Sequence, residues 1–191
     1  PGDDPRYLDW NLYARSDRYY IRKFEDETNL RCFFVVDQST SMAYGSIDHK
    51  KCDYAVTLAA SLALLLHRQG DGVWLLSFAE NVIDFMPAKH RQSHLRQFFH
   101  SLEREPQGGS TQLAPPLEEL QTLIKRRGMI VMISDFLTDL STLESQLQPL
   151  RAAGHEVLLF QVLDPAEISF EFAHAAQFDD LESRQQMYID P

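Results

Sequence analysis

The chain has 191 residues, a length typical of a single domain. Its content of 44% hydrophobic and 24% charged residues is that of an ordinary globular protein and excludes a disordered or collagen-like chain. The 28 acidic residues outnumber the 18 basic ones, and the resulting net charge of −10 repels phosphate backbones, so we expect no nucleic-acid partner.

Short apolar runs alternate along the chain with segments of helical periodicity. Residues 30–36 (LRCFFVV) have the length and composition of a strand buried on both faces. A helix is predicted over residues 54–69, with Leu58, Leu62, Leu65 and Leu66 on one stripe. The remaining predicted elements, in chain order, are a strand (73–78), a tight turn into a second strand (82–86), helices carrying Leu95 to Leu102 and Leu113 to Ile124, a strand (129–133), a helix carrying Leu140 to Leu150, and a strand (157–163).

This alternation predicts an α/β fold built on a doubly wound, mostly parallel sheet, with helices on both faces and one antiparallel edge hairpin. The tail, residues 175–191, is predicted to form one strand, a loop and a return strand. We expect residues 30–191 to form a single globular unit and residues 1–29 to form an N-terminal strap packed on it. Trp10 would anchor that strap; the alternative is that this polar segment is a docking surface for a partner.

The cysteines and the apolar runs bear on location. Cys32, in an apolar run, and Cys52, in a polar loop, are expected to be inert thiols in a reducing compartment rather than a disulfide pair. No apolar run approaches the ~18 residues of a membrane-spanning helix, so we expect no direct membrane contact from this segment. These thiols favour a cytoplasmic location. The chain begins at Pro1 with neither Met nor a signal peptide, as expected of a segment of a longer protein, so a membrane anchor upstream stays open.

Polar segments follow the predicted buried strands, at the sheet edge where open α/β folds bind ligands. Asp37, Ser39 and Ser41 follow the first strand, Asp135 follows the strand over residues 129–133, and Thr111 lies in a GGST segment before a helix. All are oxygen donors without histidine or cysteine, a set that suits Mg²⁺ rather than Zn²⁺. Each segment alone is typical of a turn or a helix start; the combination is more specific.

These residues resemble the metal-ion-dependent adhesion site of von Willebrand factor A domains. The resemblance extends along the chain to the bacterial family catalogued as domain of unknown function 58. Its hallmarks are matched by residues 2–10 (GDDPRYLDW), Lys51 with residues 53–55, residues 69–71 (QGD), and the ending around residues 178–182 (FDDLE) and 190–191.

The resemblance implies a von Willebrand factor A-like fold, a divalent cation (Mg²⁺ or Mn²⁺) that a partner helps to hold, and a binding role without catalysis or an organic cofactor. By position, Ser39, Ser41 and Thr111 would ligate the metal while Asp37 and Asp135 would hold its waters. Ser110 intervenes before Thr111, so either hydroxyl could be the ligand. Family members are associated with MoxR-type AAA+ ATPases, which makes such an ATPase the expected partner.

Two other functions stay open from the sequence. One is a scaffold of the same fold that binds no metal. The other is a phosphohydrolase with Asp37 as the phosphoryl acceptor, but that chemistry needs a carboxylate two residues later, where this chain has Ser39. If a metal is present, neutral hydroxyl ligands leave it with unneutralised charge, so we expect a protein partner to offer it a Glu or Asp carboxylate.

Overall fold

The apolar runs form a five-stranded sheet, seen in a computed structural model that describes residues 10–18, 30–87, 92–104, 113–169, 176–179 and 186–189. The strands are β1 (Arg31–Asp37), β2 (Gly72–Phe78), β3 (Val82–Met86), β4 (Met129–Ser134) and β5 (Glu156–Gln161). Their order across the sheet is β3-β2-β1-β4-β5, and only β3 runs antiparallel to its neighbour. The sheet therefore has the predicted mostly parallel pattern with one antiparallel edge hairpin.

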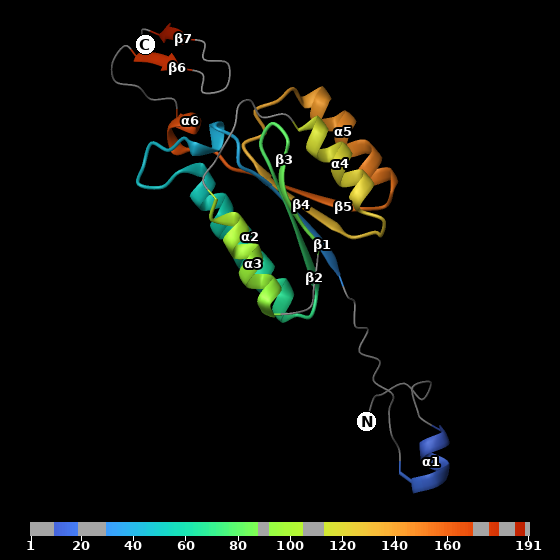
Figure 1. Cartoon of the computed structure of the whole chain (residues 1–191). Helices are drawn as coiled ribbons and strands as arrows, with labels where there is room; N and C mark the ends of the chain where they lie inside the picture. Colours follow the sequence, from blue (N-terminus) through green and yellow to red (C-terminus); the bar gives the residue numbers. More distant parts are fainter. Residues whose placement is uncertain are drawn as a thin grey trace.

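Helices cover both faces of this sheet (Figure 1). Helices α2 (Lys51–Arg68) and α3 (Gln92–Leu102) pack on one face, and α4 (Ala114–Leu123) and α5 (Leu140–Ala152) pack on the other. Strand β1 lies between the two cores because its side chains alternate: Phe34 and Val36 face one core, and Phe33 and Val35 face the other. These features confirm the predicted doubly wound α/β fold class.

Helix α2 differs from the prediction in two ways. It begins at Lys51, three residues before the predicted start at residue 54, so Cys52 lies buried in its first turn and not in a polar loop. Its most buried side chains are small ones, Ala55, Ala59 and Ala63, whereas Leu65 of the predicted apolar stripe is 53% exposed. Alanines let a helix axis approach a sheet closely, and leucines then flank the contact instead of filling it.

Both cysteines are free and buried, in agreement with the prediction of inert thiols. Burial, with the nearby charge of Asp71, raises the pKa of the Cys32 thiol to about 12. A thiol that stays protonated at neutral pH is a poor nucleophile.

Shorter elements complete the described chain: α1 (Trp10–Ser16), the 3-10 turn η2 (Ser41–Ala43), α6 (Pro165–Ser169), β6 (Ala176–Asp179) and β7 (Gln186–Ile189). Strands β6 and β7 pair antiparallel with each other, as predicted for the tail. Strand β5 ends two residues before its predicted end, and α6, which the sequence did not reveal, follows it.

The N-terminal segment is described only over residues 10–18, where the Trp10 side chain is 62% exposed. Residues 1–9 and 19–29 lie outside the described residues, so a strap packed on the domain, like the single unit over residues 30–191, stays a prediction. Among the helices of the described ranges, none has the length and hydropathy needed to cross a bilayer.

Candidate metal site

The candidate site lies at the point in the sheet where the strand order reverses. From β1 the chain goes to β2 on one side, and β4 lies on the other side of β1. Asp37 ends β1, and Asp135 directly follows β4. The carboxyl ends of two parallel strands that flank such a switch point form the usual ligand crevice of open α/β sheets. The topology thus places both predicted carboxylates at this crevice.

The loop after β1 folds its hydroxyl groups around Asp37. The Asp37 carboxylate accepts a hydrogen bond from the Ser39 amide at 2.8 Å, and the Oγ atoms of Ser39 and Ser41 lie 3.0 Å apart. All three side chains are buried. The turn η2 begins at Ser41 and fixes the direction of the chain there. The segment that the sequence predicted as a ligand loop is therefore a compact turn of oxygen donors.

Ser134, the last residue of β4, links the two strand ends. Its hydroxyl donates to Asp37 Oδ2 at 2.5 Å and accepts from the amide of Phe136 at 2.9 Å. Burial raises the pKa of Asp37 to about 6, although the hydrogen bonds from Ser134 and Ser39 favour the ionised form. The negative charge of Asp135 makes a smaller contribution in the same direction as burial.

Asp135 has a cationic partner that the sequence did not reveal. The ammonium group of Lys51 lies 2.9 Å from Asp135 Oδ2 and 2.7 Å from Glu167 Oε1, and Lys51 is buried although it is a lysine. Burial lowers the pKa of Lys51, but its hydrogen bonds to Glu167 and Asp135 outweigh this effect and raise the pKa above its ordinary value. Lys51 is therefore a buried cation beside the candidate site.

This ion pair continues into a network that ties α6 to the loop before α2. The Glu167 carboxylate also accepts from the Asp164 amide at 2.8 Å. The buried Asp164 carboxylate accepts from the amide and the hydroxyl of Ser46, at 2.8 and 2.5 Å. The backbone of Asp135 has a partner as well, because the side-chain amide of Gln161 donates to its carbonyl at 3.2 Å. Asp135 is thus held through both its side chain and its backbone.

The described residues fit a Mg²⁺ or Mn²⁺ ion by the kind and spacing of their donors. Two ligands on adjacent vertices of an octahedron with metal–oxygen distances of ~2.1 Å lie about 3.0 Å apart, and the Ser39 and Ser41 hydroxyl oxygens have this separation. Between Asp37 and these serines in the sequence, the side-chain amide of Gln38 is buried without a hydrogen-bond partner in the described part of the chain. A polar group in that position is normally satisfied by water or a ligand.

Thr111, the third predicted hydroxyl ligand, and its alternative Ser110 lie outside the described residues. The structure therefore brings together four of the five predicted residues: Asp37, Ser39, Ser41 and Asp135. Within the described ranges there is no group of three or more His, Cys, Asp or Glu residues that could hold a metal ion. Any site here would rely on hydroxyl groups as well as carboxylates.

Comparison with known families and proteins gives matches along the whole chain. The sequence model of the family described as "Protein of unknown function DUF58" matches residues 1–191. Uncharacterized protein Mb1516 of Mycobacterium bovis and Uncharacterized protein Rv1480 of Mycobacterium tuberculosis are each 32% identical over 198 residues, covering 100% of this chain. The chain spans 61% of the length of these relatives.

Solved structures with a similar fold are more distant in sequence. An aerotolerance-related membrane protein from Bacteroides fragilis superposes with a TM-score of 0.61 at 14% identity, over 84% of this chain and 81% of that one. The conserved hypothetical protein BatB from Bacteroides thetaiotaomicron superposes with a TM-score of 0.60 at 14% identity, over 85% and 80% of the two chains. At this identity the likeness shows a shared fold.

Proposed function

The chain belongs to the DUF58 family, and from this premise we propose that it is a metal-dependent protein-interaction module. The observation that carries the proposal is the donor set at the switch point of the sheet, where Asp37, Ser39 and Ser41 are buried and linked by hydrogen bonds. Ser39 and Ser41, with Thr111, would hold the ion, and Asp37 and Asp135 would support its water ligands. When bound, the ion supplies a Lewis-acidic position that a partner's carboxylate can occupy.

The environment of Asp37 supports binding rather than catalysis. A phosphoryl acceptor must present a free carboxylate oxygen to its substrate. Here Oδ1 accepts from the Ser39 amide and Oδ2 accepts from the Ser134 hydroxyl, and the side chain is buried. The residue two positions later is Ser39, which cannot act as a carboxylic general acid. We therefore propose no catalytic role for Asp37 and no enzymatic activity for the module.

The family resemblance suggests a MoxR-type AAA+ ATPase as the partner. We propose that the partner inserts a Glu or Asp carboxylate at the Ser39–Ser41 face. A pull-down with such an ATPase, with and without EDTA, tests this for the wild type and for Ser39→Ala. We expect recovery only from the wild type without EDTA, and equal recovery in all four samples would reject binding through this site.

A metal-free scaffold is the second candidate, and Lys51 is the observation that favours it. Its ammonium already neutralises part of the carboxylate charge at the site, 2.9 Å from Asp135. In this alternative the lysine provides permanently what a divalent ion would provide on binding.

A thermal-shift titration with Mg²⁺ and Mn²⁺ separates the two candidates. An ion at 100 times its dissociation constant stabilises the folded state by about 2.7 kcal/mol, so we expect a higher melting temperature in millimolar metal. Ser39→Ala should lose this shift, whereas Ser145→Ala, at an exposed serine of α5, should keep it. A wild-type melting curve that is the same in metal and in EDTA would leave the scaffold as the better account.

A further inference from the structure

A cavity of about 440 Å³ lies beside the candidate metal site, where the loop before α2, the start of α2, the end of β5 and α6 meet. Two residues belong to both places. Lys51 lines the cavity and pairs with Asp135, and Gln161 lines the cavity and donates to the Asp135 carbonyl. A molecule that occupies this cavity would therefore touch the side chains that hold Asp135.

The rim of the cavity is unusually apolar for a surface. Four large apolar side chains that line it are exposed: Ile47 by 59%, Tyr54 by 62%, Leu163 by 39% and Ile168 by 71%. Single exposed apolar residues are common, but a contiguous group around a hollow is typical of a protein-interaction site.

Several contacts hold the loop that carries Ile47 in one conformation. A Cβ atom on Gly45 would lie 2.6 Å from the His49 carbonyl oxygen, so the two ends of the loop approach as closely as the backbone allows. Ser46 is held by the buried Asp164 carboxylate, and the Lys51 amide donates to the Tyr44 carbonyl at 2.9 Å. The structure thus presents Ile47 in a fixed position, which lowers the entropic cost of binding a partner there.

The charges on the rim favour an acidic occupant. Lys51 and Asp164, which also line the cavity, are already engaged with Asp135, Glu167 and Ser46. His49 and Lys50 are exposed and form no ion pair with the described residues. On a chain of net charge −10, counted with neutral histidines, Lys50 is thus an exposed positive charge on the rim. The exposed Asp48 and Asp53 lie in the same stretch of sequence but do not line the cavity.

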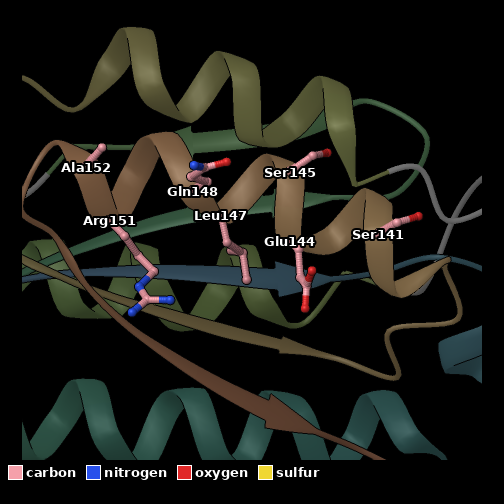
Figure 2. A pocket seen from close by; sticks show the side chains of 7 residues that line it. All are labelled: Ser141, Glu144, Ser145, Leu147, Gln148, Arg151 and Ala152. Carbon is pink, nitrogen blue, oxygen red and sulfur yellow. The ribbon is translucent and has the colours of Figure 1, made fainter.

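A larger hollow along α5, of about 860 Å³, lacks this combination (Figure 2). Its described lining comes from one helix and contains none of the exposed large apolar side chains of the described chain. Glu144 and Arg151 give it charges of both signs. Size alone therefore does not single out a docking surface here, whereas exposed large apolar side chains on a rigid frame do.

We propose that the cavity lined by Ile47, Tyr54, Leu163 and Ile168 receives a segment of a partner protein in which a large apolar side chain is adjacent to a carboxylate. The apolar side chain would fill the hollow, and the carboxylate would face His49 and Lys50. The proposal rests on the proposed function as an interaction module and specifies the partner's chemistry. It adds a second contact beside the metal site, and this contact needs no metal.

An NMR titration of the ¹⁵N-labelled chain with short peptides tests this proposal. The probe is N-acetyl-Phe-Glu-amide; the matched controls are N-acetyl-Phe-Gln-amide, N-acetyl-Phe-Lys-amide and N-acetyl-Ala-Glu-amide, each up to ~10 mM in EDTA at pH 7. We expect shifts of the backbone amides of Ile47, Tyr54, Leu163 and Ile168. The Phe-Glu peptide should bind at least about threefold more tightly than each control, since a rim ion pair contributes modestly.

Variants localise the effect. Ile168→Ser should weaken binding of the Phe-Glu peptide at least about fivefold, since the variant removes part of the apolar wall. Lys50→Ser should make the Glu and Gln peptides bind equally. Leu123→Ser, at a leucine of α4 that is 38% exposed and does not line the cavity, should leave binding unchanged. No amide shift with any peptide, an equal response of the wild type and Ile168→Ser, or a preference for the Lys peptide would overturn the proposal.

Two further arms separate the possible outcomes. Shifts of the same amides that grow with protein concentration, without peptide, would assign the cavity to a second copy of this chain and overturn the proposal. Repeating the titration in Mg²⁺ distinguishes this proposal from the proposed metal function. Peptide binding that is unaffected by Mg²⁺, in a chain whose melting temperature Mg²⁺ also leaves unchanged, would retain the cavity and reject the metal. A Mg²⁺-dependent melting temperature without peptide shifts would do the reverse.

Discussion

Asp37 and Asp135 lie at the ends of neighbouring strands and are equally buried, but their surroundings differ. Asp135 faces the ammonium of Lys51, whereas the donors that Asp37 receives from the described residues, Ser39 and Ser134, are neutral. One carboxylate thus has a resident cation, and burial makes the other costly to ionise. Under the proposed metal function, Asp37 is therefore the carboxylate whose charge an ion from outside the chain would neutralise.

The largest expected change in the free energy of unfolding is that of Lys51→Met, which removes the cation beside Asp135. The variant leaves Asp135 buried without a charged partner, and breaking a buried ion pair from one side costs about 3–5 kcal/mol. Chemical denaturation at pH 7 should show this loss, with Lys50→Met as the matched control. Lys50 is exposed, so its variant should stay within about 0.5 kcal/mol of the wild type. Equal stability of the two variants would mean that Asp135 does not depend on Lys51.

In EDTA, Asp37→Asn should change the free energy of unfolding in the opposite direction and stabilise the protein. The pKa of Asp37 is raised from 3.8 to about 6 in the folded state, so the folded protein holds this proton more tightly than the unfolded chain does. Each pKa unit corresponds to about 1.36 kcal/mol, which gives a gain of at most ~3 kcal/mol for the neutral variant at pH 7. Urea denaturation measures the gain, and Asp48→Asn, at an exposed aspartate, should give none. A loss of stability in Asp37→Asn would show that the ionised carboxylate is favourable without a cation.

The same pKa shift predicts a pH profile for the metal-free wild type. A raised carboxyl pKa makes the contribution of Asp37 most favourable below the unfolded value of 3.8, and the contribution declines as the pH rises through about 6. The difference in unfolding free energy between Asp37→Asn and the wild type should therefore grow between pH 4 and pH 6. If this difference were constant between pH 4 and pH 6, the pKa of Asp37 would not be raised in the folded protein.

Ser134→Ala sharpens the comparison by removing one donor from Asp37. A hydrogen bond to an ionised group contributes about 1.5–3 kcal/mol, so we expect a loss of about 2 kcal/mol at pH 7. The loss should shrink at pH 4, where Asp37 is protonated. Thermal unfolding at both pH values measures this; a loss of the same size at both would assign the effect of Ser134 to its contact with the Phe136 amide.

Glu167→Gln should have the smallest effect. Glu167 is the second partner of Lys51, but its side chain is 28% exposed and is therefore partly screened by water. We expect a loss of ~1 kcal/mol or less in chemical denaturation, with the exposed Glu156→Gln as the control. A loss as large as that of Lys51→Met would make Glu167, and not Asp135, the main partner of the lysine.

The fold and part of the site could be predicted because their signals are local. Buried strands appear as short apolar runs, and the polar residue after such a run marks the edge where ligands bind; Asp37 and Asp135 were found in this way. The alternation of strands and helices then predicted the sheet and its helix layers. The pattern of leucines overestimated their burial in α2, since periodicity does not reveal how close a helix lies to its sheet.

The ionic network could not be predicted from local patterns. The partners of Lys51 are 84 and 116 residues away in the sequence, and the predicted helix began after this residue. Helix α6, which carries Glu167, has 5 residues and is too short to show a helical period. The one available signal was the match of Lys51 to a family hallmark, which marks a position without saying what it contacts.

The alanine face of α2 makes the polar site sensitive to changes in the apolar core. Ala55 and Ala59 lie on the same helix as Lys51, the farther of them about 12 Å along its axis. A larger side chain at either position would lift the helix from the sheet and draw the ammonium away from Asp135. During evolution, a mutation that enlarges this core would thus alter electrostatics at a crevice that it never touches. The core and the crevice are therefore expected to diverge together among relatives.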